Sequence, residues 1–261
     1  MKQWNGLLKK EWKTMRFSLF FVLGLNVIAV ILIPLLLNEW LNVPRVEASI
    51  VVGFLWLMFQ TMLAAILLLT SLERDMKQPE LWLHSTASIF KLTGAKYASA
   101  FIITIMTIVW NGLLLIVSVA TGSQQLGVSL GELIQIGSYF AGITVLSTIP
   151  YMVIAFFFWT IYQLLKPYLK SFASAVAVLL FLMLPAFLGL MQKWANYLPK
   201  FGELHFPLPT NIGGALVPGR GEFSFYFGSG SLYFSDLLII ILLMALVYVG
   251  SMKWFEKKVR L

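Results

Sequence analysis

The chain has 261 residues, of which 59% are hydrophobic and 11% charged, with a formal net charge of +8 and no cysteine. A soluble domain usually carries about 25% charged residues, so this composition excludes a water-soluble globular core. The absence of cysteine excludes disulfides and thiolate metal sites. The apolar residues gather in long runs, which is typical of a membrane protein.

Six apolar runs reach or approach the roughly 20 residues that one helical crossing requires. None of the six runs contains Asp, Glu, Lys, Arg or His. The last and shortest run ends at Met252. Trp254 and Phe255 extend that run into the headgroup region. The predicted spans cover residues 17–37, 50–72, 97–120, 133–165, 171–191 and 237–255. We therefore expect one all-α, polytopic membrane domain over residues 1–261, with the first run a retained anchor because it is longer than a signal core.

Basic residues predict the orientation, because Lys and Arg favour the cytoplasmic side of short loops. Most of the 19 fall at the two termini, in segment 73–96 and in the short loop 166–170. Both termini are therefore predicted in the cytoplasm, with 73–96 a cytoplasmic loop and 192–235 the largest outer loop. The same division among separate segments argues against a nucleic-acid-binding surface.

The N-terminal segment has apolar residues at helical spacing, with lysines on the other faces. They are Trp4, Leu7, Leu8, Trp12 and Met15. This pattern predicts an amphipathic helix lying in the cytoplasmic interface. The alternative is a basic flank that only sets the orientation of the first span.

The predicted cytoplasmic loop 73–96 combines charged residues with an apolar cluster, Leu81-Trp82-Leu83. Gln78-Pro79-Glu80 before this cluster suits a helix start, since Pro is tolerated at the first position and Glu favours the positive end. Such a loop either lies on the lipid headgroups, with Trp82 as the anchor, or docks into a groove of a soluble partner.

The stretch ERDMKQPELWLHSTASIFKLTGAKYASA resembles the loop after the second helix of type-2 ABC transporter permeases. The matching residues are Glu73, Asp75, Leu81, Leu83, Ser85, Ser88, Leu92, Gly94 and Lys96. Thr86 stands where that family frequently has Pro. The resemblance continues in the basic N-terminal helix, the six spans and the long outer loop before the last span.

This resemblance implies a permease subunit of an ABC exporter in a bacterial plasma membrane, with a second permease, identical or related, beside it. A separate cytoplasmic ATPase would bind ATP and Mg²⁺ and receive the coupling loop in a cleft. The implied docking residues are Glu73, Asp75, Glu80, Leu81, Trp82 and Leu83.

The chain itself is not expected to be an enzyme or to hold a cofactor or metal. A phosphate-binding P-loop requires Gly-Lys before Ser or Thr, and this chain has no Gly-Lys dipeptide. Its two histidines, His84 and His205, are predicted on opposite sides of the membrane. A second hypothesis is a non-transporting scaffold or regulatory protein that docks a cytoplasmic partner through the same loop.

Polar residues within the spans have two interpretations: they line a substrate path, or they bond between helices, which is favoured for any one residue. Those proposed for a path are Asn26, Gln60, Thr61 and Asn111. Up to Met252 no predicted span holds an acidic, basic or histidine side chain, which counts against ion-coupled transport. For the outer loop 192–235 the resemblance implies short re-entrant helices, while its aromatic residues equally suit an outer cap, and alternation over Phe223–Phe227 also suits an edge strand.

Overall fold

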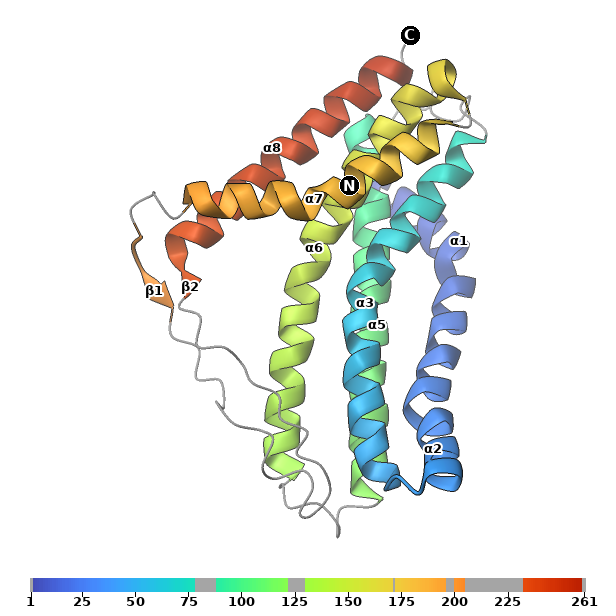
Figure 1. The fold of residues 1–261 in the computed structure, drawn as a ribbon. Coiled ribbons are helices and arrows are strands. Elements are labelled where there is room, and N and C mark those ends of the chain that lie inside the picture. Colours follow the sequence, from blue (N-terminus) through green and yellow to red (C-terminus); the bar gives the residue numbers. More distant parts are fainter. Residues whose placement is uncertain are drawn as a thin grey trace. The chain divides into compact units, whose positions relative to one another are not determined.

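The structure is a computed structural model that describes residues 2–77, 88–121, 130–170, 172–195, 200–204 and 232–259. Its helices are α1 (Lys2–Val27), the π-helical η1 (Ile28–Leu32), α2 (Ile33–Leu41), α3 (Arg45–Met76), α5 (Ile89–Ala120), α6 (Leu130–Leu169), α7 (Phe172–Ala195) and α8 (Phe234–Val259) (Figure 1). Two strands of two residues each, β1 (Glu203–Leu204) and β2 (Leu232–Tyr233), complete the described elements. The fold is helical, as the apolar runs predict.

Five segments among the described residues are long and apolar enough to cross a membrane. They are Gln3–Leu41, Arg45–Met76, Ile89–Ala120, Ile134–Leu169 and Phe234–Lys257. They coincide with the first four predicted spans and the last. The remaining predicted span, 171–191, lies in α7. The apolar segment identified in this helix is Phe172–Met183, which is shorter than one crossing. By the length and composition of its helices the chain is a polytopic membrane protein, while the sixth crossing and the orientation of the termini stay predictions.

The described residues divide into two compact units. The first contains Met1–Leu72 and Lys91–Met152, and the second contains Glu73–Phe90, Val153–Leu208 and Gly228–Leu261. The boundaries between the units fall inside α3, α5 and α6.

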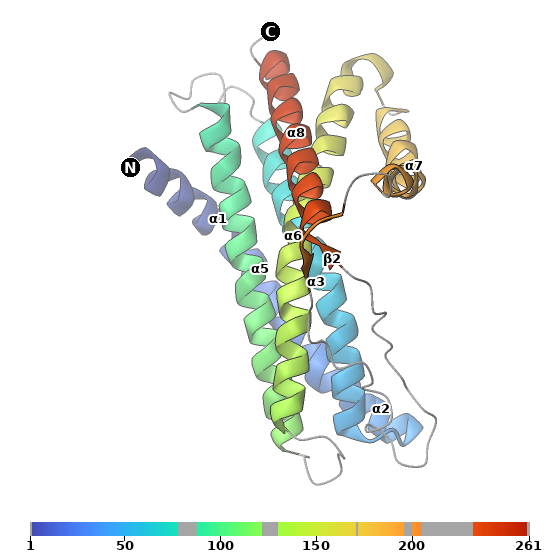
Figure 2. The same ribbon diagram turned by 90° about the vertical axis from the view of Figure 1, so that its left-hand side faces the viewer.

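In the first unit, α3, α5 and the N-terminal part of α6 run alongside one another, and α1 runs along α3 (Figures 1 and 2). Their apolar core consists of Val46, Ile50, Phe54, Leu57, Ile108, Val119 and Ile136. The rings of Phe54 and Phe140 join α3 to α6, with centroids 4.8 Å apart. Gly53 allows α3 and α5 to approach closely, because a Cβ atom there would overlap the side chain of Leu115.

The first predicted span is joined to the N-terminal segment without a break, because α1 continues from Lys2 to Val27. The α-helical pattern changes only at η1, where the Ile33 N–H donates to the Ile28 carbonyl five residues back. Pro34 explains this change, since proline lacks an N–H and its ring crowds the carbonyl four residues earlier. The prolines at 150 and 185 lie inside α6 and α7, which remain helical through them.

In the second unit, aromatic rings join the C-terminal part of α6 to α8. Phe156 is fully buried against Trp159, Tyr248 and Phe255, and the Trp159 and Phe255 ring centroids are 5.2 Å apart. These contacts give α8 an apolar face on α6, as expected of helices that cannot rely on water to drive them together.

The two short strands pair antiparallel, with Glu203 opposite Tyr233 and Leu204 opposite Leu232. Gly202 precedes them with a φ of 68°, and a Cβ atom there would stand 2.9 Å from the Cβ atom of Phe234. Glycine is therefore required at this position. The pair brings together the two ends of the predicted outer loop, whose proposed re-entrant helices and edge strand lie outside the described residues.

Candidate functional site

The structure describes both ends of the predicted coupling loop. Glu73 and Asp75 lie in the last turns of α3, and α5 begins at Ile89. The other four predicted docking residues, Glu80, Leu81, Trp82 and Leu83, lie outside the described residues. The described part of this loop is therefore its base, where its two ends meet α3 and α5.

A buried polar cluster joins the two ends of this loop within the first unit. The Lys96 ammonium donates to Glu11 Oε1 at 2.9 Å and to Ser71 Oγ at 2.7 Å, and the Ser71 hydroxyl donates to Glu11 Oε2 at 2.9 Å. Ser71 comes from α3, Lys96 from α5 and Glu11 from α1. We name these three residues the loop-base cluster.

The loop-base cluster is almost sealed from solvent, with the side chains of Lys96 and Glu11 exposed by 1% and 5%. Removing either charge would break a buried ion pair, which is far more costly than breaking an exposed one. A second contact supports the same junction, because Trp4 of α1 packs on Gly94 of α5, where a Cβ atom would lie 3.3 Å from the indole. The N-terminal helix is thus fixed to the start of α5.

Glu73 belongs to a different polar cluster, in the second unit. Its Oε2 atom accepts hydrogen bonds from Trp159 Nε1 at 3.2 Å and from Gln163 Nε2 at 3.0 Å. Lys166 Nζ lies 3.9 Å from the other carboxylate oxygen, and both of these side chains are about half exposed, so this ion pair contributes little. The first predicted docking residue is therefore held against α6, with part of its surface accessible.

The structure brings together two of the four residues proposed for a substrate path. Asn26 Oδ1 accepts from Gln60 Nε2 at 2.5 Å and from Trp56 Nε1 at 2.8 Å, which joins α1 to α3. The Gln60 Oε1 atom has no partner among the described residues, and this side chain lines a groove of about 460 Å³ between the two helices. The Thr61 hydroxyl instead donates to the Met58 carbonyl of its own helix at 2.7 Å.

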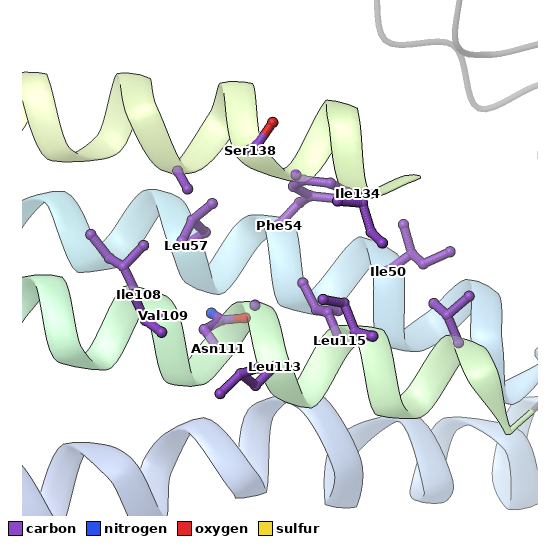
Figure 3. A pocket seen from close by; sticks show the side chains of 15 residues that line it. Ile50, Phe54, Leu57, Ile108, Val109, Asn111, Leu113, Leu115, Ile134 and Ser138 are labelled. Carbon is purple, nitrogen blue, oxygen red and sulfur yellow. The ribbon is translucent and has the colours of Figure 1, made fainter. Parts of the chain in front are cut away.

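Asn111 lies elsewhere, at a cavity of about 320 Å³ lined by α3, α5 and α6 (Figure 3). The side chain is fully buried, and neither its Nδ2 nor its Oδ1 atom has a hydrogen-bond partner among the described residues. Asn26 and Gln60 therefore bond to each other between helices, and Thr61 bonds within its own helix. The Asn111 amide has no partner among the described residues. Of the four, Gln60 lines the groove and Asn111 lines the cavity, so the described residues form no continuous polar path.

Comparison with known proteins identifies no relative: no family model, no curated protein and no solved structure matches this chain. Within the described ranges, no three His, Cys, Asp or Glu side chains gather as a metal site would require. His84 and His205 lie outside those ranges.

Sequence reasoning missed the partners that make these clusters. The sequence presents Lys96 as a basic flanking residue that also matches the family motif, and it places Trp159 and Gln163 inside an apolar span. One signal was available: Glu11 is the only acidic residue before Glu39, in a segment rich in lysine. A lone carboxylate in such a segment favours a specific partner, although the sequence does not say which one.

Proposed function

We propose that the chain is the membrane permease subunit of an ATP-binding cassette exporter. It would act with a separate cytoplasmic ATPase and a second permease, identical or related, in a bacterial plasma membrane. The support is the resemblance of residues 73–96 to a coupling loop, together with five apolar helices long enough to span a bilayer. ATP and Mg²⁺ would bind to the partner subunit.

The observation that carries this proposal is the loop-base cluster. Ser71 and Lys96 stand at the two ends of the loop and are bonded to each other and to Glu11. A loop closed at its base cannot absorb a push by unfolding at its ends without breaking a buried ion pair. Displacement of the loop is therefore passed to α1, α3 and α5.

A mechanism follows from this connection. Closure of the ATPase subunits on ATP would press on the loop, and the loop-base cluster would carry the movement into the helices of the first unit. Glu73, bonded to Trp159 and Gln163, would engage α6 in the same stroke. The helices would then change their packing between two arrangements and move the substrate outward.

The experiment is ATP turnover by the reconstituted complex in proteoliposomes. Trp82→Ala and Glu80→Arg should each lower transport-coupled turnover while membrane insertion stays intact, because a buried interface Trp commonly carries about 2 kcal/mol or more of the binding free energy. The matched control is Trp40→Ala, since Trp40 is 78% exposed at the end of α2. Normal turnover in both loop variants would reject the docking of the ATPase on this loop. A cytoplasmic partner that binds the chain regardless of ATP would favour the non-transporting scaffold protein.

A further inference from the structure

The buried Asn111 amide is an exception to the usual pairing of polar groups. Its exposed fraction is 0%, and both its donor and its acceptor lack partners among the described residues. Buried amides in native proteins nearly always bond to protein, water or a ligand. A side chain with two unmet groups beside a cavity therefore indicates that something else completes it.

The cavity has the size and chemistry of a binding site for an apolar molecule. Its volume of about 320 Å³ lies at the lower end of the roughly 300–1,000 Å³ range of small-molecule sites. Its lining is apolar except for Asn111 and Ser138, and the Ser138 hydroxyl already donates to the Gln135 carbonyl at 2.7 Å. Figure 3 shows Asn111 among the apolar side chains that α5 contributes to this wall.

Two glycines on facing helices provide part of the space. Gly112 of α5 and Gly137 of α6 both line the cavity, and a Cβ atom added at either would meet no atom within 4 Å. Glycine lowers helix propensity by about 1 kcal/mol relative to alanine, so two such residues on the walls of one cavity keep volume open at a cost to the helices.

The cavity is open at a rim formed by Val109, Leu113 and Ile116, which are exposed on α5. In a bilayer, an exposed apolar rim faces lipid, so a guest enters from the membrane. Water is a poor occupant, because an ordered water requires two to four polar partners, and the unpaired groups of the described lining are the two atoms of one carboxamide, which diverge from each other. A charged guest is disfavoured because none of the described residues that line the cavity is charged.

We propose that this cavity binds an uncharged amphiphile with a long apolar body and one amide or hydroxyl group part-way along it. The carboxamide of Asn111 offers both a donor and an acceptor, so its complement is a group that also donates and accepts. If the chain is an exporter, molecules of this class are its substrates. That last step alone rests on the proposed function.

The test uses photo-crosslinking of the full chain in lipid nanodiscs with two probes of equal length. One is a diazirine-bearing fatty amide, and the other is the hydrocarbon analogue that lacks the amide. The amide probe should label the peptide containing Val109 to Ile116 at least about threefold more than its analogue, as one hydrogen bond implies. Asn111→Leu should abolish this difference, because leucine offers no hydrogen bond to the amide probe.

Steric variants provide a second measurement that does not depend on the amide. Gly137→Leu should fill the cavity and reduce labelling by both probes at this peptide. The matched control is Gly142→Leu on the same helix, because Gly142 is exposed, does not line the cavity and has the same open surroundings. The variants are compared at equal recovery of monodisperse protein, so a folding defect is not mistaken for lost binding.

Two labelling results would overturn the proposal: equal labelling by both probes in the unaltered chain, or an amide preference that persists in Asn111→Leu. A separate experiment treats the Leu113→Cys variant with a bis-maleimide, and covalent dimers would also overturn the proposal. Such dimers would show that a second copy covers the cavity, and this is a clean test because the chain has no cysteine. An amide preference with no ATPase partner would support this site and reject the exporter assignment, so the two failures are distinguishable.

Discussion

Replacing Lys96 by Met tests the loop-base cluster quantitatively. The variant keeps a four-atom apolar stem but removes the ammonium that bonds to Glu11 and Ser71 at 2.9 and 2.7 Å. Glu11, 5% exposed at its side chain, would then be a buried carboxylate that keeps the Ser71 hydroxyl as a donor but has lost its counter-charge. Breaking a buried pair on one side costs about 3–5 kcal/mol, so we expect the free energy of unfolding to fall by that amount.

The assay is unfolding in mixed micelles with increasing SDS, followed by circular dichroism and tryptophan fluorescence. Lys96→Met is measured beside Glu11→Leu and the double variant, because a double-mutant cycle isolates the energy of the pair. The double variant removes both charges and should be more stable than Lys96→Met alone. Lys91→Met is the matched control, since Lys91 lies on the same helix with an exposed side chain and should lose less than about 1 kcal/mol.

Two results would refute this reasoning. A loss below about 1 kcal/mol for Lys96→Met would mean that the ammonium is not buried against Glu11 as described. A double variant whose loss equals the sum of the two single losses would mean that the residues are not coupled. Either outcome would remove the physical link between the loop and the N-terminal helix.

Further predictions concern α3 in both units. Glu73→Ala should destabilise the chain by about 1–3 kcal/mol in the same assay, because it leaves the Trp159 and Gln163 donors without their acceptor. Lys166→Met should change stability by less than about 1 kcal/mol, since its 3.9 Å pair with Glu73 is half exposed, and a larger loss would contradict the geometry. Gly53→Val should cost about 1–3 kcal/mol through overpacking against Leu115, and an unchanged stability would show that α5 yields there.

The helical architecture was predictable because hydrocarbon imposes a simple rule. Every backbone group must be satisfied within the segment, so an apolar run of sufficient length becomes a helix whatever its neighbours. The run at 50–72 accordingly lies inside α3, which extends to Arg45 and Met76. The ends were less predictable, since helices continue into their polar flanks when no Pro or Gly stops them.

The pairing of side chains was not predictable, because it depends on which helix faces arrive together. In the sequence Lys96 resembles the many other basic residues that flank the spans. In the structure its side chain is 1% exposed and lies beside Glu11. Asn26 and Asn111 look alike in their spans, yet the first bonds to Trp56 and Gln60 and the second has no partner among the described residues. Helix rotation decides these outcomes, and spacing along one helix does not specify it.

The most direct test of the central claim is purification of the tagged chain from its native membrane in mild detergent, with mass spectrometry of the proteins that accompany it. The account predicts an ATPase with Walker motifs at near-equal stoichiometry, lost on Trp82→Ala and kept in Trp40→Ala. Recovery of no ATPase, under conditions that preserve a known ABC complex, would contradict the exporter assignment and favour a membrane scaffold.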